Sequence, residues 1–354
     1  MLLHVFVYIQ IIGSTLLWWG DTLKVTFLGD IMQHQSQMDA AIKNGGNTND
    51  SKSYDYSTYY KHLQKLFEKS DLRIANMETT FSSPPYSGYP VFNSPVSLLE
   101  ASKSGGIDIF LSANNHICDK GGKGIESTIS AYNALRVPFI GAYRSKDERE
   151  QLYPLIVELK GVRMAILNYT YGTNGIPVPQ PYVVNKLDSV QIKEDILKAK
   201  KSNVHFIIAC IHWGIEYKLD SSVEQKRWKR IFNTNGVNII IGSHPHVVQE
   251  VEVKKELSGE VKRVTAYSLG NAISNMTAPY TRTGMVFTLQ IVREISGQIR
   301  LIEPEYELIW TSRPNAVENN FTILPIKEFI DSSQLFKNKD EWHKMKNEYS
   351  KLQR

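Results

Sequence analysis

The chain has 354 residues, enough for one large domain or two ordinary ones around a sizeable buried core. Its hydrophobic content of 42% and charged content of 22% are typical of a globular protein. The formal net charge of +5 comes from 41 basic and 36 acidic residues without a long basic run, which argues against nucleic-acid binding.

The two cysteines, Cys118 and Cys210, have no partners at metal-finger spacing. The sequence therefore implies neither a disulfide framework nor a zinc finger. We expect both residues to be half-buried apolar thiols.

The first twenty residues carry information about location. Residues 2–19 contain no Lys, Arg, Asp or Glu, and the first charged side chain is Asp21. This length is near the lower limit for a membrane span and is long for the apolar region of a signal peptide. A cleaved signal peptide, an uncleaved anchor and a buried strand or helix are the alternatives. The pattern favours export, so we expect residues 1–20 to be a signal peptide or membrane anchor. The protein would then lie at the cell envelope and face outside the cytoplasm.

From Asp21 to residue 140 the hydrophobic pattern alternates between strands and helices, which is typical of an α/β domain. Strands are expected at residues 24–28, 72–75, 107–111 and 137–140. Helices are expected at residues 54–69, 95–104 and 124–135.

The second half continues this alternation and then becomes mainly β. A hairpin is expected at residues 153–159 and 163–169, followed by a Gly- and Pro-rich loop at residues 170–184. Helices at residues 187–201 and 221–235 then alternate with strands at residues 204–211 and 237–241. Further strands are expected at residues 264–269, 285–291 and 299–310. The lysine-rich residues 337–354 are expected to form a solvated helix.

Polar residues follow several of these strands at their carboxyl ends, which is where open α/β sheets bind ligands. Carboxylates, amides and imidazoles suit a hard or borderline divalent cation, and the absence of Cys ligands argues against a closed structural zinc site. The sequence therefore predicts a divalent-metal site built from Asp30, Glu78, Asn115, His212, His244 and His246.

The most specific of these segments is His244-Pro245-His246, because two imidazoles separated by one residue project to the same side of an extended segment. The preceding Gly242 lets the backbone approach closely. Asn114-Asn115-His116 is also informative, because two amides and an imidazole rarely follow a buried strand without a function. Taken alone, three other segments have simpler interpretations. Asp30 could be a turn or cap residue, Glu78 a surface carboxylate and His212 a core histidine.

Together these segments resemble the CapA family, also called capsule-synthesis or poly-gamma-glutamate synthesis proteins, which is similar to the calcineurin-like metallophosphoesterases. The matching segments occur in the family's order across most of the chain. They are Gly29-Asp30-Ile31-Met32, Asn76-Met77-Glu78, Ser112-Ala113-Asn114-Asn115-His116-Ile117-Cys118-Asp119-Lys120-Gly121, His212-Trp213-Gly214-Ile215-Glu216-Tyr217, Gly242-Ser243-His244-Pro245-His246-Val247 and Tyr267-Ser268-Leu269-Gly270-Asn271.

The resemblance implies a calcineurin-like metallophosphoesterase-type multilayer α/β/β/α sandwich over residues 21–325, followed by a C-terminal helical extension at residues 326–354. It also implies one or two divalent ions, Mn, Zn or Fe. Asp30 and His246 would hold the first ion, and Asn115, His212 and His244 the second, with Glu78 as the bridge.

The resemblance further implies that His116 protonates a leaving oxygen, and it raises Asn114, Glu216 and Arg282 as substrate-binding residues.

Two departures from the superfamily pattern affect the first ion. Met32 stands where that superfamily has a histidine, so this ion lacks one imidazole unless His34 bends back. Glu78 replaces the usual bridging aspartate and is longer by one methylene. A one-metal site or a non-phosphate substrate is an alternative to ordinary phosphatase activity.

Three functions remain open at this stage. The first is a metal-dependent hydrolase or transferase acting on phosphoester, amide or peptide-like bonds at the cell envelope. The second is a non-catalytic metal-binding partner in a membrane complex that makes or exports an anionic polymer such as poly-gamma-glutamate or capsule. The third is a structural α/β domain with internal histidines. Fold resemblance alone does not distinguish them.

Overall fold

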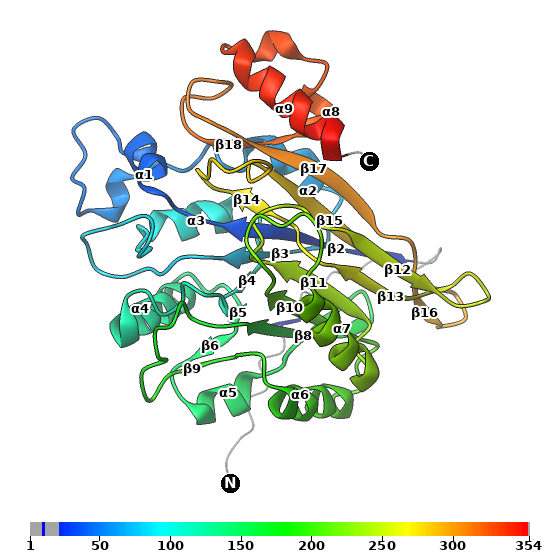
Figure 1. Ribbon diagram of the computed structural model, residues 1–354. Helices are drawn as coiled ribbons and strands as arrows, with labels where there is room; N and C mark the ends of the chain where they lie inside the picture. The colour runs from blue at the N-terminus through cyan, green and yellow to red at the C-terminus, as the bar shows by residue number, and fades with distance from the viewer. Residues whose placement is uncertain (1–8, 11–20, 353–354) are drawn as a thin grey trace.

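The computed structural model describes residues 9–10 and 21–352 of the chain (Figure 1). The predicted signal or anchor segment, residues 1–20, lies outside the described residues except for β1 (Ile9–Gln10), which pairs in parallel with β7 (Leu155–Leu159). Across the described ranges, none of the helices is long and apolar enough to span a membrane.

Most strands belong to one large sheet whose two halves face each other. In the first half, β2 (Asp21–Ile31) lies between the parallel β3 (Leu72–Met77) and the antiparallel β15 (Thr283–Arg293). The other strands of this half are β4 (Ile109–Leu111), β5 (Phe139–Ile140), β14 (Asn271–Ile273), β17 (Glu305–Ser312) and β18 (Thr322–Pro325).

In the second half, β10 (Phe206–His212) lies between β8 (Val162–Thr170) and β11 (Ile239–Ser243), and all three strands are parallel. β7 and β8 form the predicted hairpin. Strand β16 (Ile299–Leu301) pairs with β15 and with β13, and so joins the halves. The remaining strands are β12 (Val251–Lys255) and β13 (Val261–Ala266) in this half, and β6 (Ala142–Tyr143) and β9 (Val183–Val184) in a separate pair.

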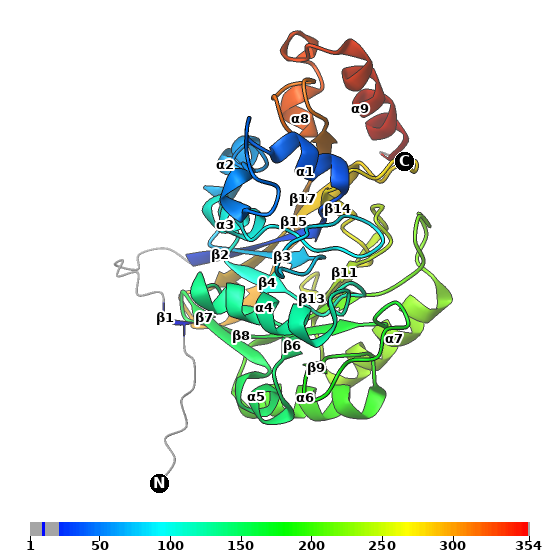
Figure 2. The ribbon, with the colours of Figure 1, turned by 90° about the vertical axis from the view of Figure 1, so that its left-hand side faces the viewer.

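The inner faces of the two halves share one apolar core. Because alternate residues of a strand point to opposite faces, Val25 and Phe27 of β2 lie in the same buried cluster as Met164 and Ile166 of β8. The outer faces contact helices: Leu167 of β8, for example, belongs to a second cluster that includes α6 and α7. Figure 2 shows the resulting order of helices, sheet, sheet and helices. The predicted α/β/β/α sandwich is confirmed.

Apart from the one at residues 54–69, the helices predicted in the α/β region are confirmed, with ends set by local capping. Asp188 accepts hydrogen bonds from the first turn of α6, and Ser222 forms a capping box with Gln225 at the start of α7, which ends at the left-handed Gly236. The helices are α1 (Gln35–Ala41), α2 (Gln64–Phe67), α3 (Ser97–Ser104), α4 (Gly121–Ala134), α5 (Lys146–Leu152), α6 (Ser189–Lys201), α7 (Val223–Asn235), α8 (Ile326–Phe329) and α9 (Lys339–Leu352). Short 3₁₀ turns lie at Ser51–Ser53, Lys61–Leu63 and Ser333–Leu335.

The predicted helix at residues 54–69 is wrong over most of its length. Only Gln64–Phe67 is α-helical, and the preceding segment turns repeatedly so that Tyr54, Tyr56 and Tyr59 are buried beside one another. Aromatic residues have modest helix propensity, and here the burial of their rings decides the backbone path.

Three further expectations are corrected. The strand predicted at residues 299–310 is two strands, because Pro304 lies between β16 and β17 and has no N–H to donate. The C-terminal helix is not solvated on all sides: Met345 of α9 is fully buried in a cluster with Trp310. Cys118 and Cys210 are fully rather than half buried.

Candidate metal centre

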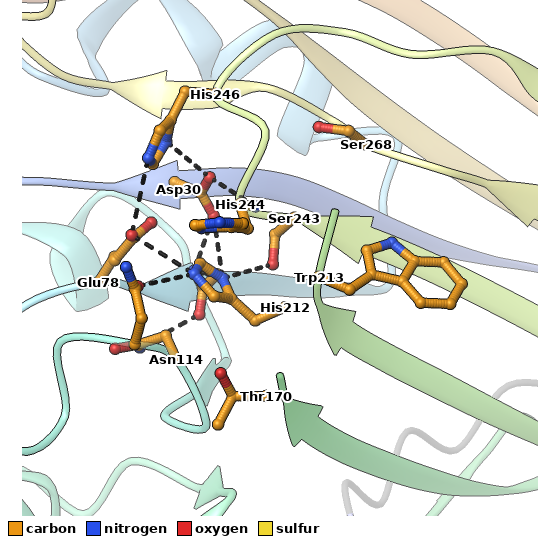
Figure 3. Close-up of polar contacts among 12 residues, drawn as sticks. Asp30, Glu78, Asn114, Thr170, His212, Trp213, Ser243, His244, His246 and Ser268 are labelled. Atoms are coloured by element: carbon orange, nitrogen blue, oxygen red, sulfur yellow. Dashed lines mark hydrogen bonds and ion pairs between the residues drawn. The ribbon is translucent and has the colours of Figure 1, made fainter. Parts of the chain in front are cut away.

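The structure brings the six predicted ligands together at the carboxyl ends of the strands. Figure 3 shows Asp30, Glu78, His212, His244 and His246. The register of the strands explains why these side chains converge. In the first half, Asp30 of β2 lies opposite Asn76 of β3, so that Glu78 follows two residues beyond. In the second half, His212 lies opposite Ser243 at the ends of β10 and β11. The six ligand residues are all buried: Asp30, Glu78, Asn115, His212, His244 and His246.

Potential ligand atoms converge in two overlapping sets that share Glu78. One contains Glu78, His244 and His246, the other contains Asp30, Glu78 and His212, and within each set the atoms lie within 4.8 Å of one another. Glu78 Oε1 is 3.5 Å from His212 Nε2 and 3.9 Å from His246 Nε2, while Asp30 Oδ2 is 3.3 Å from His246 Nδ1. Glu78 thus stands between the two halves of the cluster.

Three polar atoms of the cluster without a hydrogen-bond partner among the residues that the structure describes indicate which kind of ligand it suits. Both carboxylate oxygens of Glu78 and Nδ1 of His244 are buried and have no hydrogen-bond partner within residues 9–10 and 21–352. Leaving such groups buried without a partner costs free energy, and a carboxylate costs the most. Oxygen and nitrogen donors with no sulfur suit a hard or borderline divalent cation, so the residues fit the predicted metal.

Further buried side chains orient the ligands. Asn76 Nδ2 donates to Asp30 Oδ1 at 2.7 Å, Ser243 Oγ lies 3.0 Å from His212 Nδ1, and Asn271 Oδ1 lies 3.0 Å from His246 Nδ1. Partners of this kind fix the ring orientation and the protonated nitrogen of a ligating histidine. The sequence motifs contained all three residues without revealing these roles.

The backbone between His244 and His246 corrects one premise of the prediction. The segment is not extended, because His244 has a φ of 98° and His246 a φ of 59°. Positive φ values are uncommon outside glycine and store strain that the surroundings must offset. The His244 N–H donates to Asp30 Oδ2 at 3.1 Å, which ties this turn to β2.

The electrostatics divide the cluster into charged and neutral groups. Burial opposes ionisation of Asp30, but hydrogen bonding and charge from His246 and His212 hold its pKa below the usual value. Burial also opposes a charge on His246, yet Glu78 and Asp30 raise its pKa to about 9. Burial, with the neighbouring His212 and His246, holds the pKa of His244 well below its ordinary value.

His116 lies beside the cluster with one ring nitrogen already engaged. Its Nδ1 is 2.7 Å from Asp119 Oδ2, which also accepts the Phe92 N–H at 2.7 Å, and the rings of His116 and Phe92 pack edge to face at 4.6 Å. Asp119 therefore fixes the ring and leaves Nε2 for chemistry. Sequence reasoning missed Asp119, although it lies only three residues after His116.

Met32 and His34 do not join the cluster of potential ligands around Asp30. Met32 is buried, and His34 Nδ1 is directed toward Gln37 Oε1 and the Asn275 N–H. Within the described part of the chain, His34 belongs to neither converging set. Burial lowers the pKa of His34 to about 4, so its ring is neutral.

The three residues expected to bind substrate have different surroundings. Asn114 is fully buried and uses its amide to hold the Met77 carbonyl. The Arg282 guanidinium binds Glu341 and the Thr311 carbonyl, which leaves it unavailable to an anionic substrate. Glu216 is exposed and contributes to raising the pKa of His246, which places it in electrostatic reach of the cluster.

Two partly exposed tyrosines also flank the histidines. The ring of Tyr171 is 4.6 Å from that of His244, and the ring of Tyr217 is 6.4 Å from that of His246. Each is 45% exposed, so each offers an aromatic surface to a ligand that approaches the cluster.

Comparison with known proteins places this geometry in a family. The family model described as bacterial capsule synthesis protein PGA_cap matches residues 24–276. The chain belongs to this family. The PGA_cap match covers all six ligand residues and His116, and the CapA resemblance predicted from the motifs is confirmed.

Two curated relatives carry related names. Capsule biosynthesis protein CapA of Bacillus anthracis is 28% identical over 277 residues, which are 75% of this chain and 62% of the relative. PGA biosynthesis protein CapA of Bacillus subtilis (strain 168) is 22% identical over 298 residues, which are 79% of this chain and 71% of that protein. The PGA_cap chain described here thus spans less than two thirds of the first relative's length.

Two solved structures of Thermus thermophilus proteins are also similar. The sulfate thiohydrolase SoxB in complex with glycerol has a TM-score of 0.42 and 12% identity, over 96% of this chain and 62% of SoxB. The protein TT1561 has a TM-score of 0.40 and 8% identity, over 80% of this chain and 99% of TT1561.

Proposed function

We propose that this PGA_cap chain is a metal-dependent hydrolase that acts on the polymer, or on an intermediate, of capsule or poly-gamma-glutamate synthesis at the cell envelope. The names of the two relatives support the biosynthetic setting. One observation carries the metal: the buried oxygens of Glu78 and the buried Nδ1 of His244 have no partner among the described residues and face other potential ligands. We expect the enzyme to hydrolyse phosphoester or amide bonds.

The chain's own residues would divide the work. Asp30, Glu78, Asn115, His212, His244 and His246 would hold one or two ions of Mn, Zn or Fe. When bound, such an ion lowers the pKa of a coordinated water and neutralises charge that develops on the substrate.

His116 would hold a proton at Nε2 and give it to the leaving group, while Asp119 keeps Nδ1 in its protonated form. Glu216, Tyr171 and Tyr217 would meet the substrate outside the metal centre.

A non-catalytic role in a membrane complex for polymer synthesis or export is the second candidate. The observation that favours it is the incomplete ligand set around Asp30, where Met32 replaces an imidazole and His34 is directed toward Gln37. In this case the metal would stabilise the fold or a binding surface without supporting turnover.

Metal content tests the centre. Purified wild-type protein is expected to retain Mn, Zn or Fe in elemental analysis, and the double variant His244→Ala/His246→Ala is expected to lose it. Equal metal in both proteins would contradict the proposed centre.

A substrate screen with added Mn²⁺ separates the two candidate functions. Phosphodiesters, phosphomonoesters and γ-glutamyl amides are offered to the wild type and to His116→Ala. Turnover that depends on His116 supports the hydrolase, whereas bound metal with no turnover above the His116→Ala level favours the non-catalytic role.

A further inference from the structure

The amide of Asn115 has one end facing the metal centre and one end facing away from it. Its Oδ1 is 2.9 Å from His212 Nε2, and its Nδ2 donates to Asn174 Oδ1 at 3.1 Å. Only the oxygen of an amide can bind a cation, because the NH₂ group is a donor with no available lone pair. A half-turn of this amide would therefore remove Asn115 as a ligand.

Asn174 supplies the contact that selects the useful orientation. Its Oδ1 accepts from Asn115 Nδ2, and the Tyr171 hydroxyl lies 3.5 Å from the same oxygen. If the Asn115 amide turned over, two carbonyl oxygens would face each other. Asn174 could relieve this by turning its own NH₂ group toward Asn115, but the Tyr171 hydroxyl, which also hydrogen-bonds Asn115, would then have to accept from Asn174 instead of donating to it.

The backbone holds Asn174 in place without help from this contact. Asn174 has a φ of 50° and Gly175 a φ of 74°, in a turn where the Ile176 N–H donates to the Thr173 carbonyl at 2.8 Å. The buried Thr173 closes the turn through its hydroxyl, which donates to the Ile176 carbonyl at 2.6 Å. Asn is among the residues that best tolerate this left-handed conformation.

The side chain of Asn174 is exposed, and it bonds to other side chains. In the described structure its hydrogen bonds go to Asn115 and Tyr171, and none goes to the backbone of the turn. The contact with Tyr171 stays within the loop after β8, whereas the contact with Asn115 leaves the loop for the neighbouring centre. This second contact points to a task in that centre.

We propose that Asn174 is a positioning residue of the metal centre, which holds the Asn115 amide with Oδ1 toward the ligand cluster. The inference rests on the proposed metal-dependent function. It adds a ligand-orienting contact that comes from the loop after β8, 59 residues away from Asn115 in the sequence.

The test compares two substitutions of Asn174 by the affinity of the full-length chain for Mn²⁺, measured by titration calorimetry. Asn174→Gly removes the side chain without backbone strain, because glycine accepts a positive φ. Asn174→Asp keeps an acceptor oxygen of the same reach. We expect Asn174→Gly to weaken Mn²⁺ binding on the order of 10-fold, in line with other contacts that orient ligands, and Asn174→Asp to bind at least as tightly as wild type.

A double-mutant cycle decides whether the effect passes through Asn115. In an Asn115→Ala background, Asn174→Gly is expected to have no further effect on Mn²⁺ affinity. The metal-free unfolding temperatures of wild type and Asn174→Gly are expected to agree, which separates positioning from folding.

Three outcomes would overturn the inference. If Asn174→Gly binds Mn²⁺ as tightly as the wild type, the role of Asn174 is overturned but the metal centre is not. An undiminished loss in the Asn115→Ala background would show that Asn174 acts by another route. Absence of Mn²⁺ binding by the wild type would overturn the proposed metal-dependent function and this inference together.

Discussion

The two histidines of the His244-Pro245-His246 segment differ in how they hold a proton. Burial opposes a charge on His246, but Glu78 and Asp30 raise its pKa from 6.5 to about 9. In the metal-free chain this raised pKa favours the folded state. That contribution is fully present below pH 6.5 and is lost as the pH rises through about 9. A cation that uses His246 must displace the proton.

We therefore predict that Mn²⁺ affinity rises with pH. Between pH 7 and pH 9 the increase should be about tenfold per pH unit, since one proton leaves for each ion bound, and it should level off above pH 9. Titration calorimetry at several pH values, in buffers of different ionisation heats, measures both the affinity and the released proton. The variant His246→Gln should lose most of the slope, and equal wild-type affinities at pH 7 and pH 9 would refute the prediction.

Asp119 is expected to matter for turnover and not for metal binding. The Asp119 carboxylate keeps a proton on His116 Nδ1, so that Nε2 is the nitrogen that transfers a proton. The amide of Asp119→Asn no longer favours this arrangement. We predict a fall in turnover on the order of 100-fold, with Mn²⁺ affinity unchanged. Steady-state kinetics on the substrate found in the screen and calorimetry on the same samples provide the two measurements. A parallel loss of metal would instead make Asp119 part of the ligand scaffold.

At the scale of single residues, the sequence indicated the candidate ligands but not the residues that orient them. Each candidate lies at or just beyond the carboxyl end of a buried strand, and that position is visible in the hydrophobic pattern. Asn174 and Asn271 lie far from Asn115 and His246 in the sequence, so their contacts exist only in three dimensions. The partner of Arg282 could not be foreseen for the same reason, because Glu341 lies 59 residues away in α9.

Among the elements, the turn after β11 is the one on which the centre most depends. Gly242 lies next to the end of β11, where two segments of the chain approach closely: a Cβ at this position would lie 1.9 Å from the Tyr267 carbonyl oxygen and 2.5 Å from Trp213 Nε1. The role expected for Gly242, close backbone approach, is confirmed. The strained His244 and His246 follow within four residues.

A methyl group at Gly242 should therefore disturb both packing and metal binding. We predict that Gly242→Ala lowers the free energy of unfolding by about 2–3 kcal/mol, as overpacking does, and reduces the metal content. Chemical denaturation and elemental analysis measure the two effects. Gly172→Ala is the matched control, because a Cβ there meets nothing within 4 Å and the loop lies near the same histidines. If the two variants behave alike, the close approach at Gly242 is unimportant.

The elements themselves could be predicted where one physical signal dominated. Strands such as β10 and β11, buried on both faces, read as continuous apolar runs, and α6 and α7 show helical spacing with caps. The helix predicted at residues 54–69 was wrong because the tyrosines of this segment pack against residues that lie far away in the sequence. Tyr56 meets Gln33, and the Tyr60 hydroxyl meets Ser102.

At the scale of the whole molecule, the centre lies where the two halves of the sheet meet at their carboxyl ends. β2, β3 and the turn after β4 supply Asp30, Glu78 and Asn115, whereas β10 and the turn after β11 supply the three histidines. The sequence pattern predicted that the site lies at the carboxyl edge of the sheet. It did not predict that the two halves of the sheet face each other, because the antiparallel strands β15 and β16 that join them carry no candidate ligand.

Strand direction gives the last prediction. β2 begins at Asp21 and reaches Asp30 nine residues later, so Asp21 lies about 30 Å from the centre along the strand. Deletion of residues 1–20 should leave Mn²⁺ affinity unchanged and remove only the short β1–β7 pairing from the described fold. Deletion of residues 339–354 is the contrasting case, because it removes Glu341, the ion-pair partner of Arg282, together with the buried Met345, at a cost of about 3–5 kcal/mol of stability. Calorimetry and thermal unfolding of the two truncated chains test this arrangement. Weakened Mn²⁺ binding in the first of them would mean that residues 1–20 reach the metal centre after all.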